Sequence, residues 1–279
     1  EKYMAEVQAR MDGSSTFAQG HQYGFFPAIS AAWRISKEDW FNAASFINDL
    51  KLRASYGILG NDNVGLFQYF NNYSLNSQYV VNGVIHPGYD LTLLANPGIT
   101  WERAKKLDIG INAVFLKSFN LEFIYFQQKR SDILAIRNAS VPQLSGINTA
   151  IIPAENIGKV DNNGLEFTVG YNKRFSQDAS VFVSGNFTYA KSKIIDIDEA
   201  PGTPDWQKQT GRPLNTYLLY NAVGIMKTTE DLSVYPHPTT TPRLGDLIYE
   251  DYTNNGQITA DDMVRTKYGN IPRITYGFN

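Results

Sequence analysis

The sequence predicts an all-β chain whose antiparallel strands form an open, curved part of a large transmembrane β-barrel. Three observations support this class: apolar and polar residues alternate with a period of two, several alternating segments reach ten residues or more, and short links alternate with long ones. A strand needs about 9–11 residues to cross a bilayer with tilt, whereas strands of globular proteins commonly have about 5–6. The length of the segments therefore favours a membrane barrel over a soluble sandwich.

Alternation defines the strands one by one. In residues 50–58, Leu52 and Ile58 share one face, while Lys51 and Arg53 share the other. No segment keeps apolar residues three and four positions apart, as an amphipathic helix requires. The eight predicted strands are residues 2–11, 24–35, 50–59, 103–116, 119–130, 164–175, 179–190 and 272–279.

The links between these strands differ in length. Residues 117–118 and 176–178 are short links, and the intermediate link 36–49 has room for a helical turn. Short turns on one rim and long loops on the other are typical of outer-membrane barrels, in which the long loops are extracellular. The long links are residues 60–102, 131–163 and 191–271.

Residues 217–225 also alternate like a strand. If they crossed the wall, residues 272–279 would run in the wrong direction for the antiparallel pattern. We therefore place residues 217–225 inside the last long loop.

Aromatic side chains gather near the ends of the predicted strands, where a girdle at the level of the lipid headgroups would place them. The alternative is ordinary strand composition, because aromatic residues favour strands of every kind. The residues are Phe25, Phe26, Trp33, Trp40, Phe41, Trp101, Phe115, Phe119, Tyr125, Phe126, Tyr171 and Phe175.

Composition excludes several classes of protein. The 25 Lys and Arg against 27 Asp and Glu give a net charge of −2, so we expect no nucleic-acid partner, which would need a basic excess. Few charged residues and many aromatics exclude a disordered chain, and the absence of Cys excludes disulfides and thiolate zinc sites. The apolar runs are too short for a transmembrane helix.

Residues 251–262 have the spacing of a calcium-binding loop, with Gly256 where that loop turns sharply. Thr at position 3, a neutral Asn at position 5 and a final Asp instead of Glu predict weak binding, because fewer charges face the ion. The alternative is an Asx-rich turn, built on Asn255 and Gly256, that needs no ion. We expect no cofactor other than possible calcium. The candidate ligands are Asp251, Thr253, Asn255, Gln257 and Asp262.

Other residues with catalytic or ligand chemistry form no recognised motif. His21, His86 and His237 are scattered over loops without the spacing of metal ligands. Without a nucleophile elbow, phosphate loop or zincin motif, the sequence predicts that the protein is not an enzyme. Four acidic residues could pair for glycoside hydrolysis, but their Pro-rich surroundings favour a solvated turn. These residues are Asp196, Asp198, Glu199 and Asp205.

Residues 9–17 read ARMDGSSTF, and residues 24–36 read GFFPAISAAWRIS. Together they resemble the "R-x-DGSS-x-F … G-x-FPS-x-S-x-x-WR" signature of SusC/RagA-type TonB-linked (TonB-dependent) outer-membrane transporters of Bacteroidetes. Ala28 departs from this pattern, since the family usually has Ser there. Further matches follow in the family's order: residues 50–57 with Gly60 and Asn61, Asn96 and Pro97 with Trp101 and Glu102, residues 132–134, residues 156–160 with 163–166, Gly245 and Asp246 with residues 251–262, and residues 272–279.

The resemblance implies that residues 1–279 are one partial barrel domain, about eight strands of a 22-stranded barrel in the bacterial outer membrane. It places the signal peptide, the TonB-contacting segment and the plug upstream of residue 1. It also implies the partners: membrane lipid, TonB, a SusD-like lipoprotein, and an oligosaccharide or peptide substrate that is imported. The substrate-binding residues are unknown, because the loop aromatics cannot be told from ordinary packing.

Two alternatives remain open at this point. One is a TonB-dependent receptor for siderophores or vitamins. The other is a soluble all-β carbohydrate-binding or adhesin module, which would bury the apolar strand faces, including Leu52, Ile109 and Phe167, against a second layer.

Overall fold

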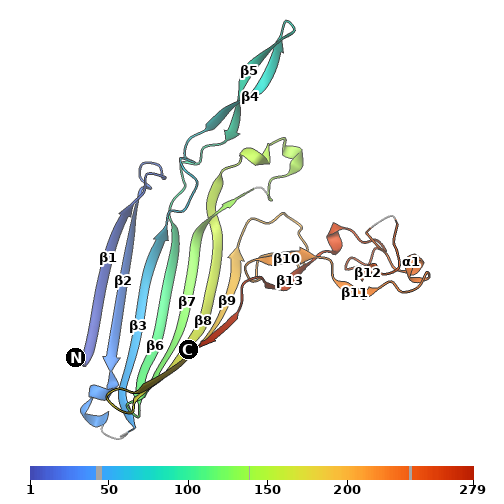
Figure 1. Ribbon diagram of the computed structural model, residues 1–279. Coiled ribbons are helices and arrows are strands. Elements are labelled where there is room, and N and C mark those ends of the chain that lie inside the picture. The colour runs from blue at the N-terminus through green and yellow to red at the C-terminus, as the bar shows by residue number, and fades with distance from the viewer. Residues whose placement is uncertain (42–45, 138, 239–240) are drawn as a thin grey trace. The chain divides into compact units, whose positions relative to one another are not determined.

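The computed structural model describes residues 1–41, 46–137, 139–238 and 241–279, and it folds into two compact units (Figure 1). The first unit comprises Glu1–Ala200 and Pro272–Asn279. Pro201–Ile271 form the second unit. No helix in the described part of the chain is long and apolar enough to cross a membrane.

An eight-stranded antiparallel sheet dominates the first unit, in the order β1-β2-β3-β6-β7-β8-β9-β14. Each of its strands overlaps one of the eight predicted strands, so the predicted fold class and strand count are confirmed. The strands are β1 (Tyr3–Gly13), β2 (Tyr23–Arg34), β3 (Ile47–Asn61), β6 (Glu102–Phe115), β7 (Phe119–Ile136), β8 (Ala154–Arg174), β9 (Ser180–Asp196) and β14 (Ile274–Phe278).

The sheet is open, with β1 and β14 as its two edges. Both edges pair with one neighbour each, β1 with β2 and β14 with β9. No second layer covers the apolar side in the residues described, since Ile109 stays 47% exposed and Phe167 37% exposed. Within the described residues the sheet is therefore neither closed on itself nor one layer of a two-layered sandwich.

Three strands extend farther toward the long loops than the sequence predicts. β7 ends at Ile136 instead of 130, β8 begins at Ala154 instead of 164, and β9 ends at Asp196 instead of 190. These boundaries were wrong because the period of two is lost there: residues 133–136 are apolar on both faces, and most of residues 155–163 are polar. A bulge also interrupts the pairing of β7 with β8 near Ile133, where Asp132 has a φ of 58°.

The short turns lie together at one rim of the sheet (Figure 1). That rim holds residues 116–118 and 175–179, together with the predicted helical turn, which is two 3₁₀ turns, η1 (Ile35–Lys37) and η2 (Asp39–Phe41). Residues 42–45 of the same link lie outside the described part.

The long link between β3 and β6 contains a hairpin that sequence reasoning missed. Its strands are β4 (Asn72–Val81) and β5 (Val84–Leu93). Asn82 and Gly83 connect them with φ values of 51° and 79°. An Asn-Gly pair between alternating residues is a strong hairpin signal, so this element could have been predicted. Between β7 and β8 lie the 3₁₀ turns η3 (Gln143–Ser145) and η4 (Thr149–Ile151).

Short elements make up the second unit: β10 (Thr216–Leu219) pairs with β13 (Val264–Gly269), and β11 (Ala222–Ile225) pairs with β12 (Leu247–Tyr249). One helical turn, α1 (Asp231–Val234), and the 3₁₀ turn η5 (Ala260–Asp262) complete it. Residues 217–225 therefore stay outside the eight-stranded sheet, as predicted.

Candidate functional site

Strand register divides the eight-stranded sheet into one apolar and one polar face. Leu52 pairs with Ile111, and its neighbour Arg53 pairs with Gly110. Paired residues of adjacent strands point to the same face, so each set continues across the sheet. The apolar face includes Val7, Ile29, Trp33, Leu52, Ile109, Ile111, Phe123, Leu165, Phe167, Phe187 and Phe278, whereas the polar face includes Glu6, Gln8, Ser30, Lys51, Arg53, Lys106, Asp108, Asn112, Glu122, Gln128, Asn162, Glu166, Thr168 and Asn186.

The apolar face is the surface that needs a partner. Large apolar side chains on it remain exposed, and burying one fully would contribute about 1.5–3 kcal/mol. On β6 the apolar positions run from Leu107 to Phe115, which is about 27 Å of strand at about 3.4 Å per residue. That length is comparable with the apolar band, about 25 Å tall, of outer-membrane barrels. Lipid hydrocarbon therefore suits this face.

A network of three side chains ties neighbouring strands together on the polar face. Arg53 of β3 donates through Nη2 to Glu122 Oε1 at 2.7 Å and through Nε to Asn112 Oδ1 at 3.1 Å. Asn112 of β6 also donates to Glu122 Oε1 of β7 at 3.0 Å. Gly110 leaves room for this arginine, because a Cβ there would lie 3.1 Å from Arg53 Nε. The charges on this face are thus fixed in place.

Beside this network the polar face is hollowed. The hollow has a volume of about 230 Å³ and is lined by both signs of charge. Its walls come from four adjacent strands, β3, β6, β7 and β8. The lining residues are Arg53, Lys106, Asp108, Ile124, Phe126, Gln128 and Glu166.

Toward the long loops, four aromatic and aliphatic side chains form a small buried core. Phe17, Phe26, Ile99 and Trp101 pack together, with the Trp101 ring centroid 5.3 Å from the centroids of both phenylalanines. The backbone must come close here, since a Cβ at Gly60 would lie 2.0 Å from Phe26 Cζ. This core joins loop 14–22 to the segment before β6.

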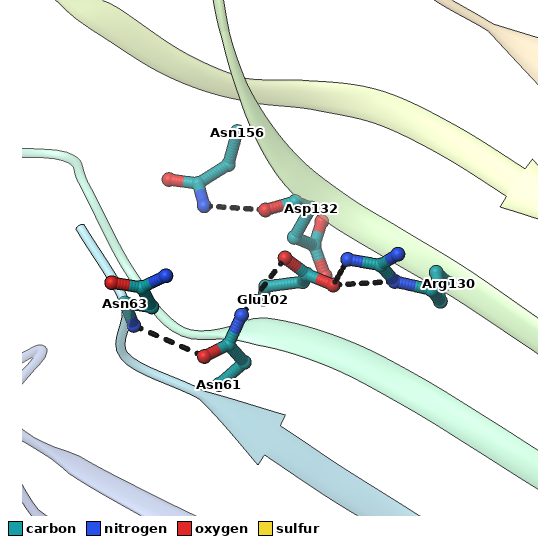
Figure 2. A network of polar contacts seen from close by, with 6 residues as sticks. All are labelled: Asn61, Asn63, Glu102, Arg130, Asp132 and Asn156. Atoms are coloured by element: carbon teal, nitrogen blue, oxygen red, sulfur yellow. Dashed lines mark hydrogen bonds and ion pairs between the residues drawn. The ribbon is translucent and has the colours of Figure 1, made fainter. Parts of the chain in front are cut away.

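A network of polar contacts around Glu102, the residue after Trp101, adjoins this core (Figure 2). Glu102 at the start of β6 accepts from Arg130 Nε on β7 at 2.6 Å and also pairs with Arg130 Nη2. Asn61 at the end of β3 donates to the other oxygen of Glu102 at 3.3 Å, and its own Oδ1 accepts from the Asn63 backbone at 3.1 Å. The carboxylate of Glu102 therefore bridges three strands, β3, β6 and β7.

Asn156 closes this group from β8. Its Nδ2 donates to the carbonyl oxygens of Asp132 at 2.7 Å and Thr100 at 2.8 Å, and its Oδ1 accepts from Thr100 N at 2.9 Å. One amide thus ties β8 to the β7 bulge and to the segment before β6. We call the contacting residues the loop-side clamp: Phe17, Phe26, Asn61, Ile99, Trp101, Glu102, Arg130, Asp132 and Asn156.

Most of the clamp comes from segments that carried the family resemblance, although those segments lie far apart in the chain. Ile99 and Arg130 are the two members that sequence reasoning did not single out, and Arg130 is the one that carries a charge. Only the strand register places it on the same face as Glu102, because Ala104, two residues beyond Glu102, pairs with Arg130.

Three of the five predicted calcium ligands meet in the second unit. Thr253 Oγ1 lies 3.2 Å from Asp251 Oδ1 and 2.9 Å from Asp262 Oδ1. Asp251 also accepts from the Gly256 backbone at 2.7 Å, and Gly256 has the positive φ of 77° expected for the sharp turn. Asn255 accepts from the Gln257 backbone at 2.8 Å and contributes only to the turn itself.

Asp262 is fully buried, with 0% exposure. Burial raises the pKa of this carboxyl, but hydrogen bonds from the backbone and hydroxyl groups of Thr259 and Thr253 outweigh burial and lower the pKa to about 2. Within the described residues, no group of three or more His, Cys, Asp or Glu side chains is placed to hold a metal ion. Calcium binding by this loop stays a prediction.

The remaining candidates do not come together. His86 stacks on Tyr79 in the β4–β5 hairpin. In the acidic stretch, Asp196 pairs with Lys159, and Asp198 accepts from the backbone of Ala139. These two carboxylates are thus each held by a different local contact.

Comparisons with known proteins agree with the interpretation of the eight-stranded sheet as part of a barrel wall. The family model described as TonB dependent receptor-like, beta-barrel, matches residues 1–270. TonB-dependent receptor P3 of Formosa agariphila is 32% identical over 301 residues, which cover 100% of this chain and 28% of that protein. TonB-dependent receptor SusC of Bacteroides thetaiotaomicron is 28% identical over 201 residues, which cover 70% of this chain and 20% of SusC.

Solved structures share the fold. The RagAB peptide importer in its closed-closed state aligns with a TM-score of 0.73 at 20% identity, covering 100% of this chain and 30% of that one. The RagAB peptide transporter aligns with a TM-score of 0.75 at 20% identity, covering 99% of this chain and 29% of that one. This chain therefore spans between 20% and 30% of the length of these relatives. It belongs to the TonB dependent receptor-like, beta-barrel family, and its eight-stranded sheet is part of a barrel wall in the outer membrane.

Proposed function

We propose that the whole protein imports a nutrient across the outer membrane, either an oligosaccharide or a peptide. Import would be energised through TonB and would use a SusD-like lipoprotein as a partner. The function is translocation rather than catalysis. The observation that carries the proposal is the two-faced wall, whose exposed apolar side suits lipid and whose polar side carries fixed charges.

The polar face supplies what the inner wall of a transporter needs. Arg53, Asn112 and Glu122 satisfy one another, so the wall keeps its shape while solute or a plug passes beside it. The neighbouring hollow presents both Lys106 and Asp108, which suits a polar cargo or a polar plug surface more than an apolar one.

The loop-side clamp contributes by holding the strand ends that carry the long loops. Glu102 and Asn156 connect β3, β6, β7 and β8 at that rim. A rigid rim would give a lipoprotein lid a constant surface on which to close. The RagAB structures are named for peptide import, whereas the family resemblance of the sequence implies an oligosaccharide or a peptide, so the uptake experiment below is designed to separate the two cargo classes.

Uptake by a strain that lacks the gene, compared with the same strain after the gene is restored, tests this function. A strain with the full-length gene restored should accumulate a labelled oligosaccharide or a labelled peptide, and a protonophore should abolish accumulation because TonB needs the proton gradient. A mixture of oligosaccharides and a mixture of peptides, each offered as sole carbon source, separates the two cargo classes. Equal uptake with and without the gene for both mixtures would contradict nutrient import.

A further inference from the structure

The apolar face ends abruptly on the side of the long loops, and basic residues follow directly. On β6 the outward positions change from Leu107 to Lys105, and on β9 they change from Tyr189 to Lys191. We call the exposed cations beyond this border the basic belt. The belt consists of Arg103, Lys105, Lys129, Lys159, Lys191 and Lys193.

Register places the belt on one continuous surface. Lys105 of β6 pairs with Lys129 of β7, and Lys129 pairs with Asp161 of β8. Asp161 in turn pairs with Lys193 of β9. Lys105 and Ile109 are an even number of residues apart on β6, and so are Asp161 and Phe167 on β8. Alternate residues of a strand share a face, so Lys105 and Asp161 lie on the face of Ile109 and Phe167. Their pairing partners Lys129 and Lys193 lie on that face too. The belt therefore faces outward, above the lipid-facing band.

The border follows the tilt of the strands. Ile58 is still apolar on β3, but its partner on β6 is already Lys105. Leu107 is apolar on β6, but its partner on β7 is already Gln127. From β3 to β7 the border thus falls by one outward position per strand, as happens when tilted strands cross a flat membrane. From β7 to β9 the last outward apolar residues, Tyr125, Leu165 and Tyr189, lie in one register row, so the belt borders the apolar band directly on these strands.

Few acidic side chains of the protein lie beside the cations of the basic belt. Of the six belt cations, all of which the structure describes, only Lys159 has an ion pair, with Asp196 at 3.0 Å. Lys105 stands directly opposite Lys129, and like charges in that position destabilise a sheet. By contrast, Arg130 on the other face of β7 is held by Glu102. Fold stability therefore does not explain the belt, and Asp161 alone cannot neutralise it.

We propose that the basic belt binds the phosphate groups of lipid headgroups in the outer leaflet. The long-loop rim is the extracellular one in outer-membrane barrels, so the belt lies at the level of the outer headgroups. Acyl chains of the same lipid would lie on the apolar face below, past Tyr125 and Tyr189, whose amphipathic rings suit the interface. Lysine and arginine form strong charge-assisted hydrogen bonds to phosphate. The proposal rests on the orientation of the wall and not on the imported nutrient.

Lipid binding by the full-length protein in a non-ionic detergent tests the belt. Native mass spectrometry with diphosphoryl lipid A, and with the same lipid after removal of its phosphates, gives the affinity for each. We expect the phosphorylated lipid to bind at least tenfold more tightly. Each Lys or Arg near an anionic surface contributes about fivefold, so the triple variant K105Q/K129Q/K193Q should lose at least tenfold for the phosphorylated lipid. It should bind the dephosphorylated lipid unchanged.

A matched control removes two lysines of the polar face, K51Q/K106Q, from β3 and β6. Loss of binding in the triple variant and retention in the control supports the belt. Equal binding by the triple variant and the unaltered protein, or an equal loss in the control, overturns it. If the triple variant does not fold, the two lipids are compared on the unaltered protein, and equal affinity for both overturns the proposal.

Discussion

Arg130 Nε lies 2.6 Å from Oε1 of Glu102, and this ion pair joins β7 to β6 where the wall meets its long loops. The Glu102 side chain is only 13% exposed. A half-buried guanidinium and a nearly buried carboxylate each depend on the other for solvation, because water reaches them poorly. The pair therefore fixes the loop-side rim.

Replacing Glu102 with Ala should lower the stability of the full-length protein by about 1–3 kcal/mol, since Arg130 and Asn61 would lose their shared acceptor. Urea unfolding in detergent, followed by fluorescence, measures the change. The control is Arg10→Ala, which breaks an exposed ion pair with Asp12 worth about 0–1 kcal/mol. An equal effect of the two substitutions would contradict a structural role for the clamp.

Gly60→Ala should also destabilise the rim. The new Cβ would lie 2.0 Å from Phe26 Cζ, so Phe26 would have to leave its place beside Trp101, at a cost of about 1–3 kcal/mol. Gly170→Ala is the matched control, because a Cβ there meets its nearest neighbour at 3.8 Å. Faster proteolysis of loop 14–22 in the Gly60 variant alone is the expected result, and equal proteolysis of both variants would refute it.

Asp262 should make the second unit acid-sensitive. Its folded pKa of about 2 lies below the ordinary value of 3.8, so its stabilising contribution is complete above pH 3.8 and is lost as the pH falls toward 2. Asp262→Asn should therefore weaken hydrogen-exchange protection of the Thr253 and Thr259 amides at pH 7 but hardly at pH 2. Asp261→Asn, at an exposed neighbour, serves as the control. A protection loss that is the same at both pH values would contradict this role.

The 251–262 loop should bind calcium weakly if it binds an ion, with a dissociation constant of about 10⁻⁴–10⁻³ M. Entry of the ion must replace the hydrogen bonds that Thr253 makes to Asp251 and Asp262. Isothermal titration of the full-length protein, compared with Asp251→Ala, measures this. Identical calcium heats in both proteins would leave the loop as a turn that needs no ion.

Sequence alone could predict the eight wall strands because lipid on one side and a polar interior on the other impose a period of two. That period disappears where the strands leave the membrane, which is why residues 131–136 and 154–163 were taken for loop. Side-chain partnerships such as that of Glu102 with Arg130 depend on register, and register is set by pairing across the whole sheet. The bulge at Asp132 adds a shift that the sequence pattern does not reveal.

Spin labels placed along β6 and β8 of the full-length protein in a bilayer test the two-faced wall most directly. Single labels at positions 106–113 and 164–169 report collision rates with oxygen, which concentrates in lipid, and with a water-soluble nickel complex. Oxygen collisions should peak at Leu107, Ile109, Ile111, Leu165 and Phe167, and nickel collisions should be higher at the positions between them. Protection of the Ile109 and Phe167 positions from both reagents would instead mean that protein covers the apolar face, and the wall would not face lipid.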